Sequence, residues 1–189
     1  MWQGLSDWLE RFSKGWVALI ALAVFLLFTA LVLPQQALAA EKTAGEAGSP
    51  DMSFYYTAQD LYRMAEAYGE EGRAAYIRAR FTFDLIWPLV YTFFLATAIS
   101  WLHRWAAASA RLPRRLNLAP VLAALFDYLE NVSTSLVMLR YPQPTVVVDA
   151  LASIFTVLKW VLVYGSFLVL LLGAALAVVR RLKETTRRS

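Results

Sequence analysis

The string FDYLENVSTS carries polar side chains inside an apolar part of the sequence. Their spacing of i, i+3, i+4 and i+7 places on one face of a predicted helix Asp127, Glu130, Asn131 and Thr134. An ionised side chain within hydrocarbon costs roughly 2.5–3.5 kcal/mol unless it meets a partner or water. This face is therefore predicted to point into a helical bundle, where its carboxylates bind a ligand or cation, or carry a proton.

Polar residues in two other apolar runs are predicted to meet this face. Asp84 and Tyr91 lie two helical turns apart on one face of their run, and Lys159 lies inside the last run. At about 1.5 Å of rise per residue, Asp84 and Lys159 both lie roughly 30 Å from the arginines that end their runs. The predicted site is an outward-facing intramembrane pocket with Asp127 as its floor, ringed by Asp84, Tyr91, Glu130, Asn131 and Lys159.

The residue types that serve metal and cofactor chemistry are scarce. The sequence has no cysteine, which excludes disulfides, thiolate metal sites and cysteine nucleophiles. Its one histidine, His103, lies among arginines, and one chain therefore cannot supply two histidine ligands to haem. No phosphate-binding loop, dinucleotide fingerprint, zinc-protease motif or serine-hydrolase motif occurs. We therefore expect no metal and no cofactor.

Three functions are compatible with these residues. The leading hypothesis is a protein that binds or transports a lipid, a small amphiphile or a cation in the outer pocket. The second is an intramembrane lipid-modifying enzyme, with Glu130 as general acid or base and Lys159 stabilising negative charge, so whether the protein is an enzyme stays open. The third is a structural accessory subunit of a larger membrane complex, in which the polar residues only fasten helices.

The apolar runs indicate the class of protein. Hydrophobic residues make up 59% of the 189 residues and charged residues 17%, which is too apolar for a soluble domain of this size. A helix needs about 20 apolar residues to cross roughly 30 Å of hydrocarbon. Four runs approach or exceed this length, at 17–33, 83–102, 119–139 and 146–179. The sequence predicts an all-α, integral membrane four-helix bundle.

The charged segments between the runs predict the orientation. Arginines are concentrated in 103–118 and 180–189, whereas 34–80 mixes many acidic residues with its bases. By the positive-inside rule, both basic segments and both termini are cytoplasmic, while 34–80 and the turn 140–145 lie outside. The alanine- and arginine-rich composition favours a bacterial plasma membrane. Membrane lipids, including anionic ones, are the expected partners, and no nucleic-acid-binding pattern accompanies the positive charge.

The segments outside the runs carry weaker patterns. Residues 1–16 have the spacing of an amphipathic helix on the inner surface, with a solvated start to the first span as the alternative. Residues 39–53 are predicted to be a flexible linker. Residues 56–80 are predicted to form an amphipathic outer helix, whose arginines and tyrosines either cover the pocket at the lipid surface or form an ordinary connector. Its apolar stripe contains Leu61, Met64, Ala65 and Tyr68.

The first apolar run has an alternative interpretation as a cleaved signal peptide. The small residues Ala37 and Ala39 resemble a signal peptidase site, and cleavage there would leave three spans. The run is longer than a usual signal core, and its amino-terminal flank holds Asp7 and Glu10 beside its bases. These two features favour a retained helix.

Overall fold

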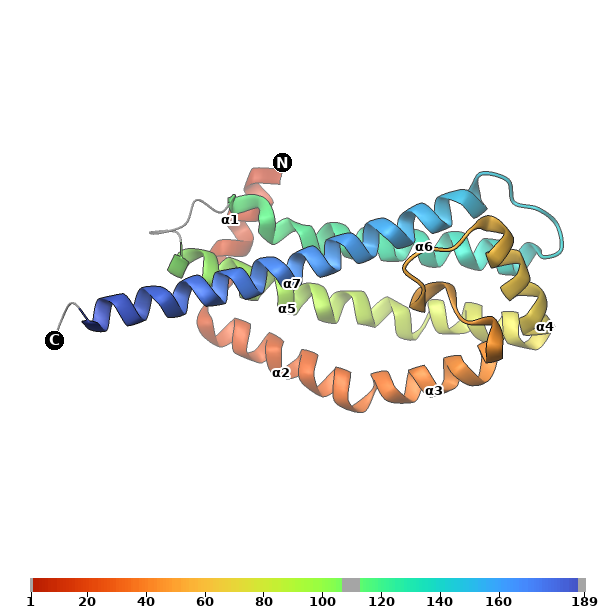
Figure 1. The fold of residues 1–189 in the computed structure, drawn as a ribbon, viewed down its shortest axis with the longest axis horizontal. Helices are drawn as coiled ribbons and strands as arrows, with labels where there is room; N and C mark the ends of the chain where they lie inside the picture. The colour runs from red at the N-terminus through yellow and green to blue at the C-terminus, as the bar shows by residue number, and fades with distance from the viewer. Residues whose placement is uncertain (1, 107–112, 187–189) are drawn as a thin grey trace. The chain divides into compact units, whose positions relative to one another are not determined.

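All regular structure that the computed structural model describes is helical (Figure 1). The structure describes residues 2–106 and 113–186. In chain order the elements are α1 (Trp2–Phe12), α2 (Gly15–Leu31), α3 (Leu33–Ala44), η1 (Gly45–Ala47), η2 (Pro50–Met52), α4 (Ala58–Arg80), α5 (Phe83–Ala106), η3 (Arg114–Leu118), α6 (Ala119–Arg140) and α7 (Val148–Thr186).

Four helical stretches are long and apolar enough to cross a membrane. Their bounds are Gly15–Ala47, Ala58–Arg104, Arg115–Arg140 and Val148–Thr186. The first three contain the apolar runs 17–33, 83–102 and 119–139, and the fourth begins two residues into the run 146–179. The prediction of an all-α protein with four such helices is therefore confirmed for the described residues.

The segment after the first apolar run differs from the prediction. Pro34 falls within the first turn of α3, where a missing N–H costs no helical hydrogen bond. The following residues are rich in alanine, the strongest helix former, and helix α3 continues to Ala44. A flexible linker is predicted from residue 39, whereas the structure has helix there and two short 3-10 turns, η1 and η2, beyond it.

The chain forms two compact units, and each is described by itself. The first unit contains the described residues of Met1–Leu26, Val90–Leu122 and Leu162–Ser189. The second unit contains Leu27–Leu89 and Ala123–Val161. Helices α2, α5, α6 and α7 supply residues to both.

In the first unit, α1 packs on η3 through buried polar contacts. The Ser6 hydroxyl donates to Oδ1 of Asn117 over 2.8 Å, and Nδ2 of Asn117 donates to the hydroxyl of Ser100 over 3.0 Å. Leu9 packs beside them against Ala96. Helix α1 is therefore amphipathic, with one face packed on protein and other positions that expose Trp2, Trp8 and Phe12.

In the second unit, α4 begins with a capping box. The backbone N–H of Asp60 donates to the Thr57 hydroxyl, and the Asp60 carboxylate accepts from the backbone N–H of Thr57. The stripe of Leu61, Met64, Ala65 and Tyr68 is buried in the core of this unit.

A break in α4 follows this stripe. Gly69 has φ 62° and ψ −175°, a region that is essentially restricted to glycine. Beyond the break, the helix continues to Arg80 and carries both Tyr76 and Arg80 into buried positions. The second half of α4 therefore belongs to the interior of the second unit.

Candidate functional site

The polar face of α6 is buried in the second unit, which supplies every residue of the network described below. Asp127, Glu130, Asn131 and Thr134 are all buried. The Thr134 hydroxyl donates to the Glu130 carbonyl over 2.9 Å, which satisfies it within the helix. Nδ2 of Asn131 donates to Oδ1 of Asp127 over 3.5 Å, whereas Oδ1 of Asn131 is buried without a hydrogen-bond partner. Helix α6 therefore offers two carboxylates and an amide oxygen to the interior.

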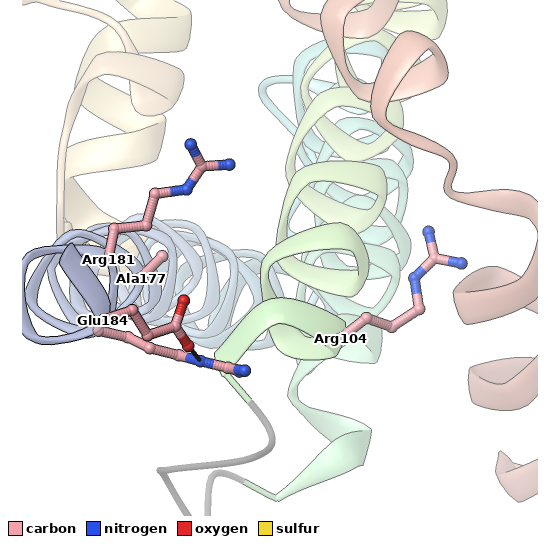
Figure 2. A pocket seen from close by; sticks show the side chains of 5 residues that line it. Arg104, Ala177, Arg181 and Glu184 are labelled. Atoms are coloured by element: carbon pink, nitrogen blue, oxygen red, sulfur yellow. Dashed lines mark hydrogen bonds and ion pairs between the residues drawn. The ribbon is translucent and has the colours of Figure 1, made fainter. Parts of the chain in front are cut away.

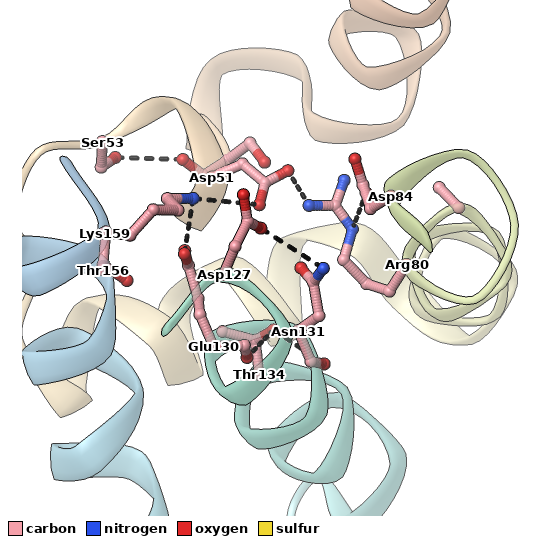
Figure 3. A network of polar contacts seen from close by, with 12 residues as sticks. Asp51, Ser53, Arg80, Asp84, Asp127, Glu130, Asn131, Thr134, Thr156 and Lys159 are labelled. Atoms are coloured by element: carbon pink, nitrogen blue, oxygen red, sulfur yellow. Dashed lines mark hydrogen bonds and ion pairs between the residues drawn. The ribbon is translucent and has the colours of Figure 1, made fainter. Parts of the chain in front are cut away.

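Lys159 of α7 is the base that meets this face (Figure 3). Its Nζ lies 2.5 Å from Oε2 of Glu130 and 3.9 Å from Oδ1 of Asp51. The ammonium also lies 5.1 Å from the centroid of the Trp160 ring, within the range of a cation–π interaction. Because the lysine is buried, these partners replace the water that would otherwise solvate its charge.

Arg80, at the carboxyl end of α4, is the second base. Its Nε lies 2.9 Å from Oδ2 of Asp84, one turn further along the chain, and its Nη1 forms an ion pair with Asp51. The guanidinium lies over the Tyr76 ring, 4.6 Å from the ring centroid. Arginine suits this position because its planar fork can bind two carboxylates and an aromatic face together.

Asp51 in η2 joins the two bases into one chain of ion pairs. The order along this chain is Asp84, Arg80, Asp51, Lys159 and Glu130, as Figure 3 shows. The Asp51 side chain is 21% exposed, compared with 7% for Lys159 and 0% for Glu130. Asp51 is therefore the member of this chain that solvent reaches most easily. We call these five residues, together with Asp127 and Asn131, the acidic network.

Hydrogen bonds from α7 hold the segment that follows Asp51. The indole Nε1 of Trp160 donates to the carbonyl of Ser53 over 3.1 Å. The Ser153 hydroxyl donates to the carbonyl of Tyr56 over 2.5 Å. These contacts restrain the backbone on the carboxyl side of η2 and so help to position Asp51.

The phenol of Tyr56 also contacts α7. The Thr156 hydroxyl donates to its phenol oxygen over 3.0 Å. Burial, together with the nearby Glu130 charge, raises the pKa of Tyr56 well above its ordinary value. The phenol is therefore protonated at neutral pH.

Charge in the acidic network is unbalanced. Its bases are Arg80 and Lys159, and its acids are Asp51, Asp84, Asp127 and Glu130. Asp127 acts electrostatically on both Asp84 and Glu130. Four carboxylates against two bases leave a surplus of two negative charges when all six groups are ionised. A buried surplus of this kind is unfavourable unless a cation or protons neutralise it.

Most of the residues that the sequence predicts for the site lie close together in the structure. Those that lie in the acidic network are Asp84, Asp127, Glu130, Asn131 and Lys159. Tyr91 belongs to the first unit, where it is buried. A role of any of these residues in ligand binding stays a prediction.

Two members of the network were not found from the sequence. The sequence pattern places Asp51 in a flexible linker. It places Arg80 in an amphipathic segment that either covers the pocket at the lipid surface or forms an ordinary connector. In the structure, Arg80 is buried and pairs with Asp51. The signal available for Arg80 is its i, i+4 spacing to Asp84. No local signal marks Asp51, because its partners come from α4 and α7 through long-range packing.

No metal-binding site is evident in the part of the chain that the structure describes. Within residues 2–106 and 113–186, no group of three or more histidine, aspartate or glutamate side chains is arranged to hold a metal ion. The carboxylates of Asp51, Asp84 and Glu130 are each directed to a base.

Comparison with known proteins adds no family assignment. No protein-family model, no curated protein and no solved structure matches the chain. The geometry of the acidic network is therefore the ground on which a function is proposed.

Proposed function

We propose that this chain is a small multi-pass membrane protein that binds a cationic amphiphile in the acidic network and exchanges it for protons. In this proposal it crosses a bacterial plasma membrane four times, with both termini in the cytoplasm. The four long apolar helices support the membrane assignment. So do the large aliphatic side chains that stand exposed on α2 and α7, such as Leu27 at 60% and Leu171 at 66%, because lipid would cover them.

The observation that carries the proposal is the surplus of carboxylates over bases in a buried network. Protons neutralise this surplus when the site is empty, and a cation neutralises it when the site is occupied. Binding of the cation therefore releases protons, and release of the cation takes them up again. Coupling of this kind links binding to pH and provides the exchange step that a transporter needs.

Asn131 is the residue that we assign to direct contact with the ligand. Its Oδ1 is a buried acceptor without a hydrogen-bond partner, which favours a donor group or a positive charge beside it. The neighbouring carboxylate of Asp127 supplies negative charge one helical turn away. Asp51 is the most exposed acid of the ion-pair chain, and we propose that the ligand enters past it.

Equilibrium dialysis with tetraphenylphosphonium, a lipophilic cation, tests this function on the full chain in mild detergent. We expect the wild type to bind the probe, with an affinity that rises about tenfold per pH unit where one proton leaves per cation bound. Asn131→Leu should weaken binding while all the ion pairs remain. Glu66→Gln is the matched control, because it removes an exposed carboxylate of α4 outside the network.

Failure of this test has a defined meaning. If neither tetraphenylphosphonium nor the smaller tetramethylammonium binds at any pH, the cation-binding function is wrong. Equal binding by wild type and Asn131→Leu would remove Asn131, and with it the assigned site, from the proposal.

A structural role is the second candidate, and the bridging position of Asp51 favours it. Through Asp51, the pairs with Arg80 and Lys159 fasten η2 to α4 and α7 within the second unit. In that case the double substitution Glu130→Met with Lys159→Met leaves both folding and cation binding as in the wild type, since buried ion pairs are often replaceable by packed apolar groups. Retained folding with lost cation binding would exclude a purely structural role.

A further inference from the structure

In the first unit, the carboxyl ends of α5 and α7 border a cavity of about 460 Å³ (Figure 2). Its lining residues are Arg104, Ala177, Arg180, Arg181 and Glu184. The size is within the range of about 300–1,000 Å³ that is typical of ligand sites. None of these residues belongs to the acidic network, so the inference below stands apart from the proposed function.

Helical spacing explains why the cavity forms. Gly173, Ala177, Arg180 and Glu184 follow at i, i+4, i+7 and i+11, so they lie along one face of α7. A Cβ atom on Gly173 would lie 3.5 Å from Cβ of Leu102, so this face approaches α5 closely. One turn later, the small side chain of Ala177 leaves space beside Arg104, and the long side chains of the last turns border that space.

The charge of the lining selects an anion. Three arginines and one glutamate line the cavity, and Nε of Arg180 donates to Oε1 of Glu184 over 2.8 Å. Figure 2 shows Arg104 extending from α5 and Arg181 from α7, so both helices contribute positive charge. Guanidinium groups bind phosphate oxygens well, because their planar donors match the geometry of two oxygens at once.

The surroundings favour a lipid phosphate over a free phosphate ion. Beside Arg181, α7 exposes a row of aliphatic side chains on one face, at i, i+7 and i+11: Leu171, Val178 and Leu182. Acyl chains can lie along such a row while the headgroup reaches the basic residues at its end. We propose that the basic cavity binds the phosphate of an anionic phospholipid, with its acyl chains along the exposed aliphatic row of α7.

Native mass spectrometry of the full chain in mild detergent tests this proposal with two probes of identical acyl chains. The probes are dioleoylphosphatidylglycerol, which is anionic, and dioleoylphosphatidylcholine, which is zwitterionic. We expect the wild type to retain the anionic lipid preferentially. Arg104→Gln with Arg181→Gln should lower that retention about fivefold for each arginine removed. Arg11→Gln, which removes an exposed arginine of α1 in the same unit, should leave it unchanged.

A steric variant separates the cavity from the general charge of the protein. Ala177→Phe fills the cavity and keeps every arginine, so we expect it to lose the anionic lipid, whereas Ala23→Phe, at an exposed position of α2 in the same unit, should keep it. A thermal melt checks that Ala177→Phe folds. If it does not fold, the proposal is tested by comparing lipid retention between the double variant Arg104→Gln with Arg181→Gln and the control Arg11→Gln. Equal retention of both lipids, or equal retention by both alanine variants, overturns the proposal. Complete displacement of the lipid by millimolar inorganic phosphate also overturns it, because the ligand would then be a free phosphate ion.

Discussion

Nζ of Lys159 lies 2.5 Å from Oε2 of Glu130, and both side chains are buried in the second unit. Taking two such charges out of water is costly, and their mutual attraction repays that cost only while both are present. The loss of one partner therefore has a different consequence from the loss of both. This difference allows folding and ligand binding to be tested separately at the same pair of positions.

Lys159→Met is expected to lower the free energy of unfolding by roughly 3–5 kcal/mol, because it leaves the Glu130 carboxylate buried without its nearest base. Combining it with Glu130→Met should restore most of this loss. Denaturant titration in detergent measures both variants against Lys42→Met, which removes an exposed lysine of α3. If Lys159→Met alone is as stable as the wild type, Lys159 does not stabilise the charged form of Glu130.

Asp51→Asn is expected to loosen η2, because it removes the charge that bridges Arg80 and Lys159. The buried donors of Arg80 and Lys159 then each lose one acceptor, which costs roughly 1–3 kcal/mol and corresponds to amide exchange about fivefold faster or more in residues 49–56. Hydrogen–deuterium exchange with peptide resolution measures this effect. Glu46→Gln, at an exposed position of η1, is the control. Unchanged exchange in 49–56 would show that the hydrogen bonds from α7 hold this segment without Asp51.

The part of the fold that the sequence predicts well is the part with strong periodicity. Four apolar runs identify the four long helices, since length and hydropathy are local properties. The polar face of α6 is likewise predicted, because the spacing of Asp127, Glu130 and Asn131 defines a face without knowledge of what it contacts. Their burial is expected from the sequence, because such groups would be costly in lipid.

The part that the sequence does not predict depends on distant contacts. Arg80 looks like an interfacial arginine, because an amphipathic helix precedes it and an apolar run follows it. Its burial results from the break at Gly69, which divides α4 and leaves its second half in the interior. Asp51 stands between small and polar residues that favour a linker, and its position depends on partners about 30 and about 110 residues further along the chain.

Gly69→Ala is expected to destabilise the second unit by about 1–3 kcal/mol, because its φ of 62° with ψ of −175° is costly for any residue with a Cβ atom. The matched comparison is Gly165→Ala within α7, where a new Cβ would meet no atom within 4 Å. That substitution should raise the free energy of unfolding by about 0.5–1 kcal/mol, as alanine does in a helix interior. Denaturant titration in detergent gives both values. Equal effects at the two glycines would contradict the strained geometry of Gly69.

Stability is expected to fall at alkaline pH because of Tyr56. Its pKa in the folded protein is raised well above the ordinary value of 10.0, by burial first and by the Glu130 charge second. Above pH 10 the unfolded chain has lost this proton while the folded chain keeps it, so the folded state is penalised as the pH rises. The free energy of unfolding should therefore decrease by about 1.4 kcal/mol per pH unit from this group alone, and the contribution is complete below pH 10.

Tyr56→Phe removes this dependence and should flatten the alkaline limb of the stability profile. The neighbouring Tyr55 is exposed, and Tyr55→Phe is the matched control, for which we expect the wild-type slope. Thermal melts between pH 9 and about pH 11 measure the stability of the three proteins.

Tyr56→Phe also loses the hydrogen bond from Thr156, so its stability at neutral pH should be lower by roughly 0.5–1.5 kcal/mol, while its pH dependence is weaker. A Tyr56→Phe profile parallel to that of the wild type would show that the phenol ionises as easily in the folded chain as in the unfolded one, and that it is not buried beside Glu130.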